Sequence, residues 1–453
     1  MSIPNHCPWV DQWLGAGTVR LRQLVEECEK LIGEYELETG ARQRRRRPAD
    51  QAKHLTAIEV TTANLVHTVL NPQEGRRAVL TGNAEGGHTR YDNPALGKPY
   101  RRLLGALEDI GWLDRRVGSR GREGRFASSI APTQTFRSKV IEAGITLTDL
   151  GRIKGEEVIL AKRKEIAKGG DAVRVSLLDY PESGQARGLR ETMRAVNAFV
   201  AGVDIAFLDD GLGPVDLTNR VQRRHFLCEP GDDLPGFDLG GRLYGGAWQN
   251  LPKTRRGGLR IEGEPIAVLD YASMAPRLAY ASLGLEAPDG DIYALPGLDT
   301  PEVRPAVKAG FNTLMCDPFI RMRGWPTSDE GDPVLPRGWS VPRFRGALLS
   351  RHPLLAPCLG TGMAPRLQNT ESVILMEVLV EMKARGIPVL SLHDGLFCPV
   401  SRSAEVKKVM EVAAYDVAHV TIPVDVKDTQ AAVKGTPKLP STRPVTFAPK
   451  SAA

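Results

Sequence analysis

Apolar and polar residues follow two different periods along this chain, and the changes between them mark the predicted elements. Residues 17–38 and 56–70 carry apolar side chains at helical spacing, which predicts two amphipathic helices. Residues 100–117 begin with the same spacing and continue as a strand, and 126–133 alternate as a second strand. The loop between these strands, 118–125, is rich in glycine and arginine.

This order of helix, strand, basic loop and strand resembles a winged-helix domain, which implies DNA binding. The resemblance implies that Arg101 and Arg102 begin a recognition helix in the major groove. It implies further that Arg120, Arg122 and Arg125 form a wing on the phosphate backbone. A small helix-and-hairpin domain with a solvated basic loop explains the same pattern equally well.

Farther along, two apolar runs each lead to an aspartate. The string "IPVLSLHDGLFCPV" predicts a hairpin with Asp394 at its tip and Gly395 in the turn. The run "PIAVLDY" places Asp270 at the end of a strand, directly before a helical pattern. Between them, Arg304 and Lys308 lie one helical turn apart and share a face.

The order of carboxylate, basic helix face and carboxylate suits one kind of chemistry. Nucleotidyl transfer uses two divalent ions roughly 4 Å apart, and hard cations take oxygen ligands. Two aspartates on adjacent strands would supply these ligands, and two cationic side chains would neutralise a triphosphate. An isolated His-Asp-Gly string is more often an ordinary turn, so the second carboxylate decides the interpretation.

Five strings in this half of the chain resemble motifs of family A DNA polymerases and of the single-subunit, phage-type RNA polymerases. "DYASMAPR" resembles motif A, "RPAVK" the R-x-x-x-K of the fingers helix, and "LHDG" the H-D of motif C. "DIY" falls where the DNA polymerases carry D-I-H, and "FDLGGRLYGG" resembles the D-x-x-G-R motif of the RNA polymerases. Each string alone is weak, but five in the same order between residues 238 and 395 favour a shared chemistry.

The resemblance implies a role for each matching residue. Asp270 and Asp394 would hold two Mg²⁺ ions, for which Mn²⁺ can substitute, and Arg304 and Lys308 would bind the triphosphate. The rest of the nucleotide pocket would comprise Tyr271, Ala275 and Asn312. Contacts with the template, the hybrid or the primer end are implied for Asp238, Gly241, Arg242, Arg277, Gln368 and His393.

Three positions depart from the family pattern. The glutamate that excludes ribonucleotides in the DNA polymerases aligns with Ala275, so exclusion by bulk is absent. The aromatic residue of the fingers helix aligns with Asn312, and Phe311 or Tyr293 is the candidate to replace it in base stacking. Gly395 stands where the families carry Glu or Ser.

The fold class implied is α+β, with a polymerase palm built on an antiparallel sheet, small helical fingers and a winged-helix-like N-terminal domain. The expected divisions are an N-terminal helix and basic linker at 1–47, a winged-helix-like domain at 48–145, a connecting or thumb-like region at 146–225, palm and fingers at 226–428, and a disordered tail at 429–453.

The function implied is a template-dependent nucleotidyltransferase, a primase or primase-polymerase of a plasmid- or phage-like replication system. Its partners would be a DNA template, nucleoside triphosphates, an RNA or DNA primer and replication proteins. A family A-like DNA polymerase for replication or repair is the alternative within this chemistry. A non-catalytic DNA-binding replication initiator or regulator is the alternative from another class.

Composition changes this picture little. Hydrophobic content of 42% and charged content of 25% are those of a soluble globular protein, and no apolar run is long enough for a membrane span. The N-terminus lacks the layout of a secretory signal, so a cytoplasmic protein without a membrane partner is expected. Six scattered cysteines form no C-x-x-C pair, which disfavours disulfides and structural zinc. The net charge of +6 is only weak support for a nucleic-acid partner.

Overall fold

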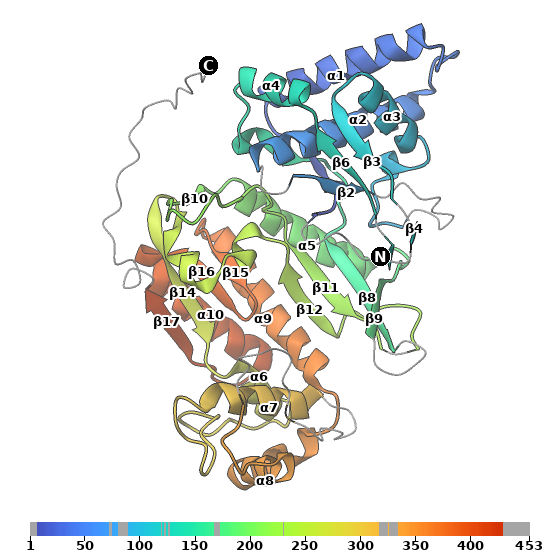
Figure 1. Ribbon diagram of the computed structural model, residues 1–453. Coiled ribbons are helices and arrows are strands. Elements are labelled where there is room, and N and C mark those ends of the chain that lie inside the picture. Colours follow the sequence, from blue (N-terminus) through green and yellow to red (C-terminus); the bar gives the residue numbers. More distant parts are fainter. Residues whose placement is uncertain are drawn as a thin grey trace.

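The computed structural model (Figure 1) mixes helices with several sheets. It describes residues 7–71, 75–79, 89–118, 120–121, 124–125, 127–166, 173–229, 231–316, 325 and 334–428, without the side chains of 120–121, 124–125, 164–166, 173–174, 316 and 428. The predicted disordered tail, 429–453, lies outside these residues. Across the described residues, no helix combines the length and the apolar content needed to cross a bilayer.

An N-terminal module forms around its own hydrophobic core. Its helices are α1 (Val19–Glu38), α2 (Pro48–Leu70), α3 (Tyr100–Asp109) and α4 (Gln134–Glu142), with short 3-10 turns at η2 (Pro94–Leu96) and η3 (Leu147–Asp149). Its strands are β1 (Leu14–Ala16), β2 (Arg77–Val79), β3 (Leu113–Arg116), β4 (Arg120–Gly121), β5 (Gly124–Arg125), β6 (Ser128–Pro132) and β7 (Leu150–Arg152). The helices and strands predicted between residues 17 and 133 are therefore observed.

The strands of this module join its two ends and carry a hairpin. An antiparallel sheet has the order β2-β6-β3, and the two-stranded hairpin β4–β5 extends from the connection between β3 and β6. Strand β1 pairs with β7, which brings the beginning and the end of the module together. Thr133 caps the N-terminus of helix α4, because its side chain accepts a hydrogen bond from the Phe136 amide. Phe136 then packs against Trp112 with ring centroids 5.2 Å apart.

The remainder of the described chain contains two larger sheets. A four-stranded sheet has the order β12-β11-β8-β9, from β8 (Ile159–Ile166), β9 (Val173–Leu177), β11 (Arg223–Leu227) and β12 (Gly240–Tyr244). A six-stranded sheet has the order β10-β13-β14-β16-β15, with β17 also paired to β14. Its strands are β10 (Ile205–Phe207), β13 (Leu259–Ile261), β14 (Glu264–Tyr271), β15 (Leu390–Leu392), β16 (Gly395–Pro399) and β17 (Val424–Asp428).

Helices hold these two sheets together. They are α5 (Gly184–Ala201), α6 (Met274–Ala281), α7 (Arg304–Cys316), α8 (Val341–Arg351), α9 (Ala364–Ala384) and α10 (Ser403–Ala418), with 3-10 turns η4 (Ala247–Asn250), η5 (Lys253–Gly258), η6 (Pro353–Cys358) and η7 (Val400–Arg402). Helix α9 is central, because it packs against β12 and against α5, α6, α7 and α10. In Figure 1 the N-terminal module lies at the top, the sheets lie in the middle, and α7 and α8 lie at the bottom.

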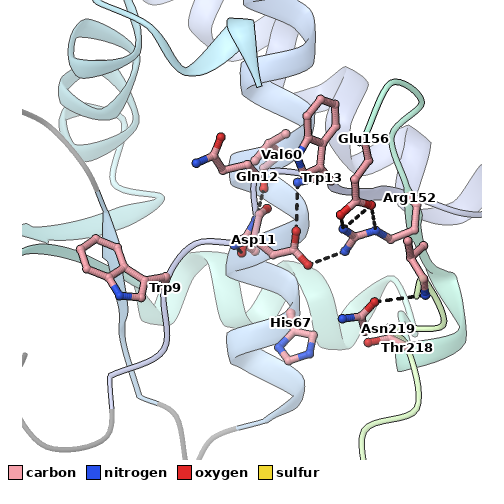
Figure 2. A network of polar contacts seen from close by, with 12 residues as sticks. Trp9, Asp11, Gln12, Trp13, Val60, His67, Arg152, Glu156, Thr218 and Asn219 are labelled. Atoms are coloured by element: carbon pink, nitrogen blue, oxygen red, sulfur yellow. Dashed lines mark hydrogen bonds and ion pairs between the residues drawn. The ribbon is translucent and has the colours of Figure 1, made fainter. Parts of the chain in front are cut away.

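Ion pairs fix the N-terminal module to the four-stranded sheet. Figure 2 shows Arg152 between the carboxylates of Asp11 and Glu156. Glu156 also pairs with Arg223, at the start of β11. Burial raises the pKa of Asp11, but the charge and hydrogen bond of Arg152 outweigh it and lower the pKa below its ordinary value. These charges are mutually compensated, so removing one would leave a partner uncompensated at the junction.

Candidate active site

The hairpin β15–β16 carries Asp394 in a tight two-residue turn. Leu392 pairs with Gly395, so His393 and Asp394 are the central residues of the turn. His393 takes a φ of 57°, and a positive φ at the first central position is what the primed two-residue hairpin turns require. The prediction that Asp394 lies at the tip of a hairpin is therefore confirmed.

Gly395 has a different role from the predicted one. It is the first residue of β16 and pairs with Asp270, so it does not supply the turn. A Cβ atom at Gly395 would lie 2.4 Å from the backbone oxygen of Leu269. Glycine is needed here because β14 and β16 approach closely, and a glutamate or serine side chain at this position would force them apart.

Strand pairing brings Asp270 and Asp394 together from distant parts of the sequence. Asp270 lies on β14 between two antiparallel neighbours and is paired with Gly395 on one side and with Asp425 on the other. Directly paired residues of antiparallel strands have Cα atoms about 4.5–5.5 Å apart. A Cβ at Gly395 would lie 3.2 Å from Asp270 Oδ1, so the Asp270 carboxylate lies over the end of the hairpin.

The electrostatic state of Asp270 shows that its charge is poorly compensated. Burial and the negative charge of Asp394 raise the pKa of Asp270 to about 6, although the charges of Lys427 and Lys308 act in the opposite direction. Within the described part of the chain, neither the Asp270 carboxylate nor the Asp394 carboxylate forms a hydrogen bond or a salt bridge; only the backbone of Asp270 is paired, with β16 and β17. Two neighbouring carboxylates in this condition form an environment that attracts cations.

Three charged residues near this pair were missed by the sequence analysis. Asp425 and Lys427 belong to β17, and both influence the pKa of Asp270. Glu371 is buried on α9, and the charges of Asp394 and Asp270 contribute to raising its pKa after burial itself. The alternation in "IPVDVK" could have indicated a strand carrying Asp425, but no local pattern indicates which strand it pairs with.

Helix α7 presents its two predicted cations to solvent. Arg304 and Lys308 are both exposed, one turn apart. Arg304 binds Asp291 through two hydrogen bonds of 2.6 and 3.0 Å, and its guanidinium lies 5.1 Å from the ring centroid of Tyr293. Lys308 is close enough to Asp270 for its charge to lower the carboxyl pKa. The helix thus has one cation oriented by the "DIY" segment and one beside the carboxylate pair.

The predicted nucleotide-pocket residues differ in accessibility. Ala275 is half-buried in the first turn of α6, and Asn312 is half-buried on α7, two turns after Arg304. Tyr271 is only 3% exposed, and its hydroxyl donates a 2.7 Å hydrogen bond to the Met410 carbonyl. Its side chain is therefore part of the contact between β14 and α10.

The suggested replacement for the missing fingers aromatic is not supported. Phe311 is fully buried and Tyr293 is 2% exposed. Their rings pack edge to face with centroids 5.9 Å apart. Neither ring therefore offers a face on which an incoming base could stack, because both are used in packing α7 against the chain before it.

The D-x-x-G-R string contributes to the walls of the site. Arg242 binds Glu371 through two hydrogen bonds of 2.6 and 2.8 Å, and Glu371 is 4% exposed. Gly241 has a φ of 84°, and a Cβ there would lie 2.5 Å from Ser372 Oγ. Glycine and arginine at these positions thus join β12 to α9. Asp238 instead lies at the surface, 3.2 Å from Arg366.

The remaining predicted nucleic-acid residues of this region are Gln368, Arg277 and His393. Gln368 is half-buried on α9, three residues before Glu371. Arg277 is 9% exposed and donates a 3.1 Å hydrogen bond to the Ala272 carbonyl, so its side chain closes the first turn of α6. His393 is exposed at the hairpin tip, the most accessible of the three.

In the N-terminal module, Arg101 and Arg102 are exposed on α3. Arg102 lines a groove of about 680 Å³ between α3 and α2, together with Lys53 and other residues. Arg120 and Arg125 pair through their backbones in the β4–β5 hairpin, but their side chains, like all of Arg122, lie outside the described residues. The phosphate-binding wing therefore stays a prediction.

A divalent-metal site of the ordinary protein kind is not preformed here. Among the described residues, no group of three or more histidines, cysteines, aspartates and glutamates could hold a metal ion. Mg²⁺, however, is commonly bound by one or two carboxylates together with water and substrate phosphates. The carboxylate oxygens of Asp270 and Asp394, which have no hydrogen-bond partner among the described residues, fit that mode of binding, in which the nucleotide would supply the remaining ligands.

Comparison with known proteins adds no family to these observations. No protein-family model matches the sequence, and a search of curated proteins found no match either. Function is therefore inferred from the residues and the geometry of the site.

Proposed function

We propose that this chain is a template-dependent nucleotidyltransferase, a primase or primase-polymerase that adds ribonucleotides on a DNA template. One observation carries the proposal: β14 and the β15–β16 hairpin bring Asp270 and Asp394 close together next to the exposed cation Lys308, and neither carboxylate has a hydrogen-bond or ion-pair partner among the described residues. A carboxylate pair of this kind is expensive to keep unless a cation binds it.

Each group has a defined task in this proposal. Asp270 and Asp394 would hold two Mg²⁺ ions, or Mn²⁺, which when bound supply activation of the attacking hydroxyl and stabilisation of the leaving pyrophosphate. Lys308 and Arg304 would bind the triphosphate. The pair between Arg304 and Asp291 is 44% and 39% exposed, and such surface pairs contribute only about 0–1 kcal/mol, so a triphosphate can compete for the guanidinium.

Two further features support the choice of substrate and template. Ala275 is small and half-buried at the start of α6, which leaves no carboxylate to crowd a ribose 2′-hydroxyl. The N-terminal module has helix α2, strand β2, helix α3 and a β3–β6 hairpin with a glycine- and arginine-rich connection, an order that favours a winged-helix DNA-binding domain. Arg101 and Arg102 would then contact the template.

Extension of labelled single-stranded DNA, with and without an annealed primer, tests the proposal. Ribonucleotides and deoxynucleotides are offered separately in Mg²⁺ and in Mn²⁺, with Asp394→Ala as the control. Unprimed product from ribonucleotides, absent in the control, is the expected result. Primed synthesis from deoxynucleotides alone would indicate a DNA polymerase instead. No synthesis combined with DNA binding would favour a non-catalytic initiator.

A further inference from the structure

One face of the four-stranded sheet differs from its buried face. On β11, Arg224 and Phe226 are buried while His225 between them is half-buried, so His225 belongs to the opposite face. On β12, Leu243 is buried while Tyr244 is exposed on the face that carries His225. The strand alternation thus separates a packed side from a side that solvent reaches.

Three rings form a row from this open face to the hairpin. The ring centroids of His225 and Tyr244 lie 4.6 Å apart with the planes tilted by 32°, and those of Tyr244 and His393 lie 6.2 Å apart. Lys162 on β8 donates a 2.8 Å hydrogen bond to His225 Nδ1 and so orients its ring. We call His225, Tyr244 and His393 the aromatic row. It ends beside Asp394, the next residue after His393.

The strands that carry the aromatic row hold more cationic than anionic side chains. The described side chains of β8, β11 and β12 include no carboxylate, and Lys162, Arg223 and Arg242 share the face of the row. Arg223 is ion-paired with Glu156 and Arg242 with Glu371, so Lys162 adds the positive charge nearest to His225. Burial, together with the charges of Lys162 and Arg223, lowers the pKa of His225 to about 3, so this ring is neutral at ordinary pH. A neutral aromatic surface among cations is the composition of sites that bind single-stranded nucleic acid.

We propose that the aromatic row binds the unpaired template DNA strand, whose bases stack on Tyr244 and His225 as the strand reaches the carboxylate pair. This inference rests on the proposed function and adds where the template lies. Unpaired bases are required because a duplex hides the faces that stack on aromatic rings. Continuity with Asp394 and the excess of cations over carboxylates on these strands favour nucleic acid over a peptide.

Tyr244→Ala, Tyr244→Phe and the matched control Tyr415→Ala test the proposal in the full-length chain. Tyr415 is an exposed tyrosine on α10, 58% accessible, away from this sheet. Binding of a fluorescent oligothymidylate is measured without nucleotide or metal. Stacking on one ring is worth about 1–3 kcal/mol, so Tyr244→Ala is expected to weaken binding by on the order of tenfold or more. Tyr244→Phe and Tyr415→Ala are expected to bind like the parent chain.

A cross-linking experiment identifies the strand. One 5-iododeoxyuridine is placed in the template overhang or, separately, in the primer, and the irradiated protein is mapped by mass spectrometry. Cross-links from the template overhang to the peptide that contains Tyr244 support the proposal. Cross-links to that peptide from the primer alone, or from neither strand, overturn it, as does unchanged oligothymidylate affinity in Tyr244→Ala.

The failure of this inference is distinguishable from failure of the proposed function. If the parent chain adds nucleotides and Tyr244→Ala has the same KM for template, the proposed function stands and the aromatic row is not the template site. A different outcome is that the parent chain adds no nucleotides, while Tyr244→Ala binds oligothymidylate more weakly than the parent and Tyr244→Phe binds it equally well. In that case the binding surface stands and the nucleotidyltransferase activity is refuted.

Discussion

Replacing Asp270 by asparagine is expected to stabilise the metal-free protein at neutral pH while it removes activity. In the folded state the pKa of Asp270 is about 6, against an ordinary value of 3.8. A difference of about two pKa units corresponds to at most about 3 kcal/mol. Because solvent still reaches this half-buried carboxylate, screening reduces the expected gain in unfolding free energy to about 1 kcal/mol.

The pH dependence of this gain has a definite sign. The folded state holds the proton of Asp270 more tightly than the unfolded chain does, so ionisation costs folded-state stability. That cost is absent below the pKa of Asp270 in the unfolded chain, about 4, and complete above its pKa in the folded chain, about 6. Asp270→Asn should therefore be more stable than the parent chain at pH 8, and the difference should disappear at pH 4.

Asp291→Asn is the matched control because its sign is opposite. Burial raises the pKa of Asp291, but the hydrogen bonds and charge of Arg304 outweigh it and lower the pKa. Asp291→Asn should lower the free energy of unfolding at pH 8 by a few tenths of a kcal/mol, since the ion pair between Asp291 and Arg304 is exposed. That contribution is lost as the pH falls through the lowered pKa.

Amide hydrogen exchange of the β14 and β16 peptides, followed by mass spectrometry with EDTA present, measures these changes where they occur. Added Mn²⁺ should protect these peptides in the parent chain and not in Asp270→Asn. If Asp270→Asn is instead destabilised at pH 8, as Asp291→Asn is, then Asp270 is a satisfied structural residue and the reasoning fails.

Three other substitutions test separate parts of the account. Gly395→Ala should lower the free energy of unfolding in urea by about 1–3 kcal/mol, because the added Cβ would meet a backbone oxygen at 2.4 Å. The control Gly346→Ala lies in open space on α8 and should raise the free energy of unfolding by about 0.5–1 kcal/mol. Arg242→Ala should lower the free energy of unfolding by about 3 kcal/mol, because it leaves buried Glu371 unpaired. A variant as stable as the parent chain would show that this ion pair does not stabilise the fold. Ala275→Glu should raise the ratio of kcat/KM for deoxynucleotides to kcat/KM for ribonucleotides by on the order of tenfold. An unchanged ratio would show that this position does not select the sugar.

Much of the fold follows from local patterns. The amphipathic spacing of residues 19–38 and 100–109 and the apolar runs around Asp270 and Asp394 are sufficient to predict these elements, because each must bury one side against a core. The tip position of Asp394 follows as well, since a polar pair between two apolar runs favours a turn.

The features that the sequence did not predict depend on which strands become neighbours in the sheets. Gly395 looks like a turn residue until its pairing with Asp270 places a backbone oxygen against it. Asp425 lies on a strand whose partner no local pattern reveals. Glu371 resembles an ordinary helix-surface glutamate, and only the packing of α9 on β12 makes it the buried partner of Arg242.

Single-nucleotide addition directed by the template base tests the central claim most directly. A primed DNA template with one defined next base is offered each labelled nucleotide in turn, with the parent chain, Asp270→Asn, Asp394→Asn and Asp291→Asn. We expect only the complementary nucleotide to be added, a loss on the order of a thousandfold or more in Asp270→Asn and Asp394→Asn, and retained addition in Asp291→Asn. Addition that survives in both Asp270→Asn and Asp394→Asn would contradict the assignment of catalysis to this pair.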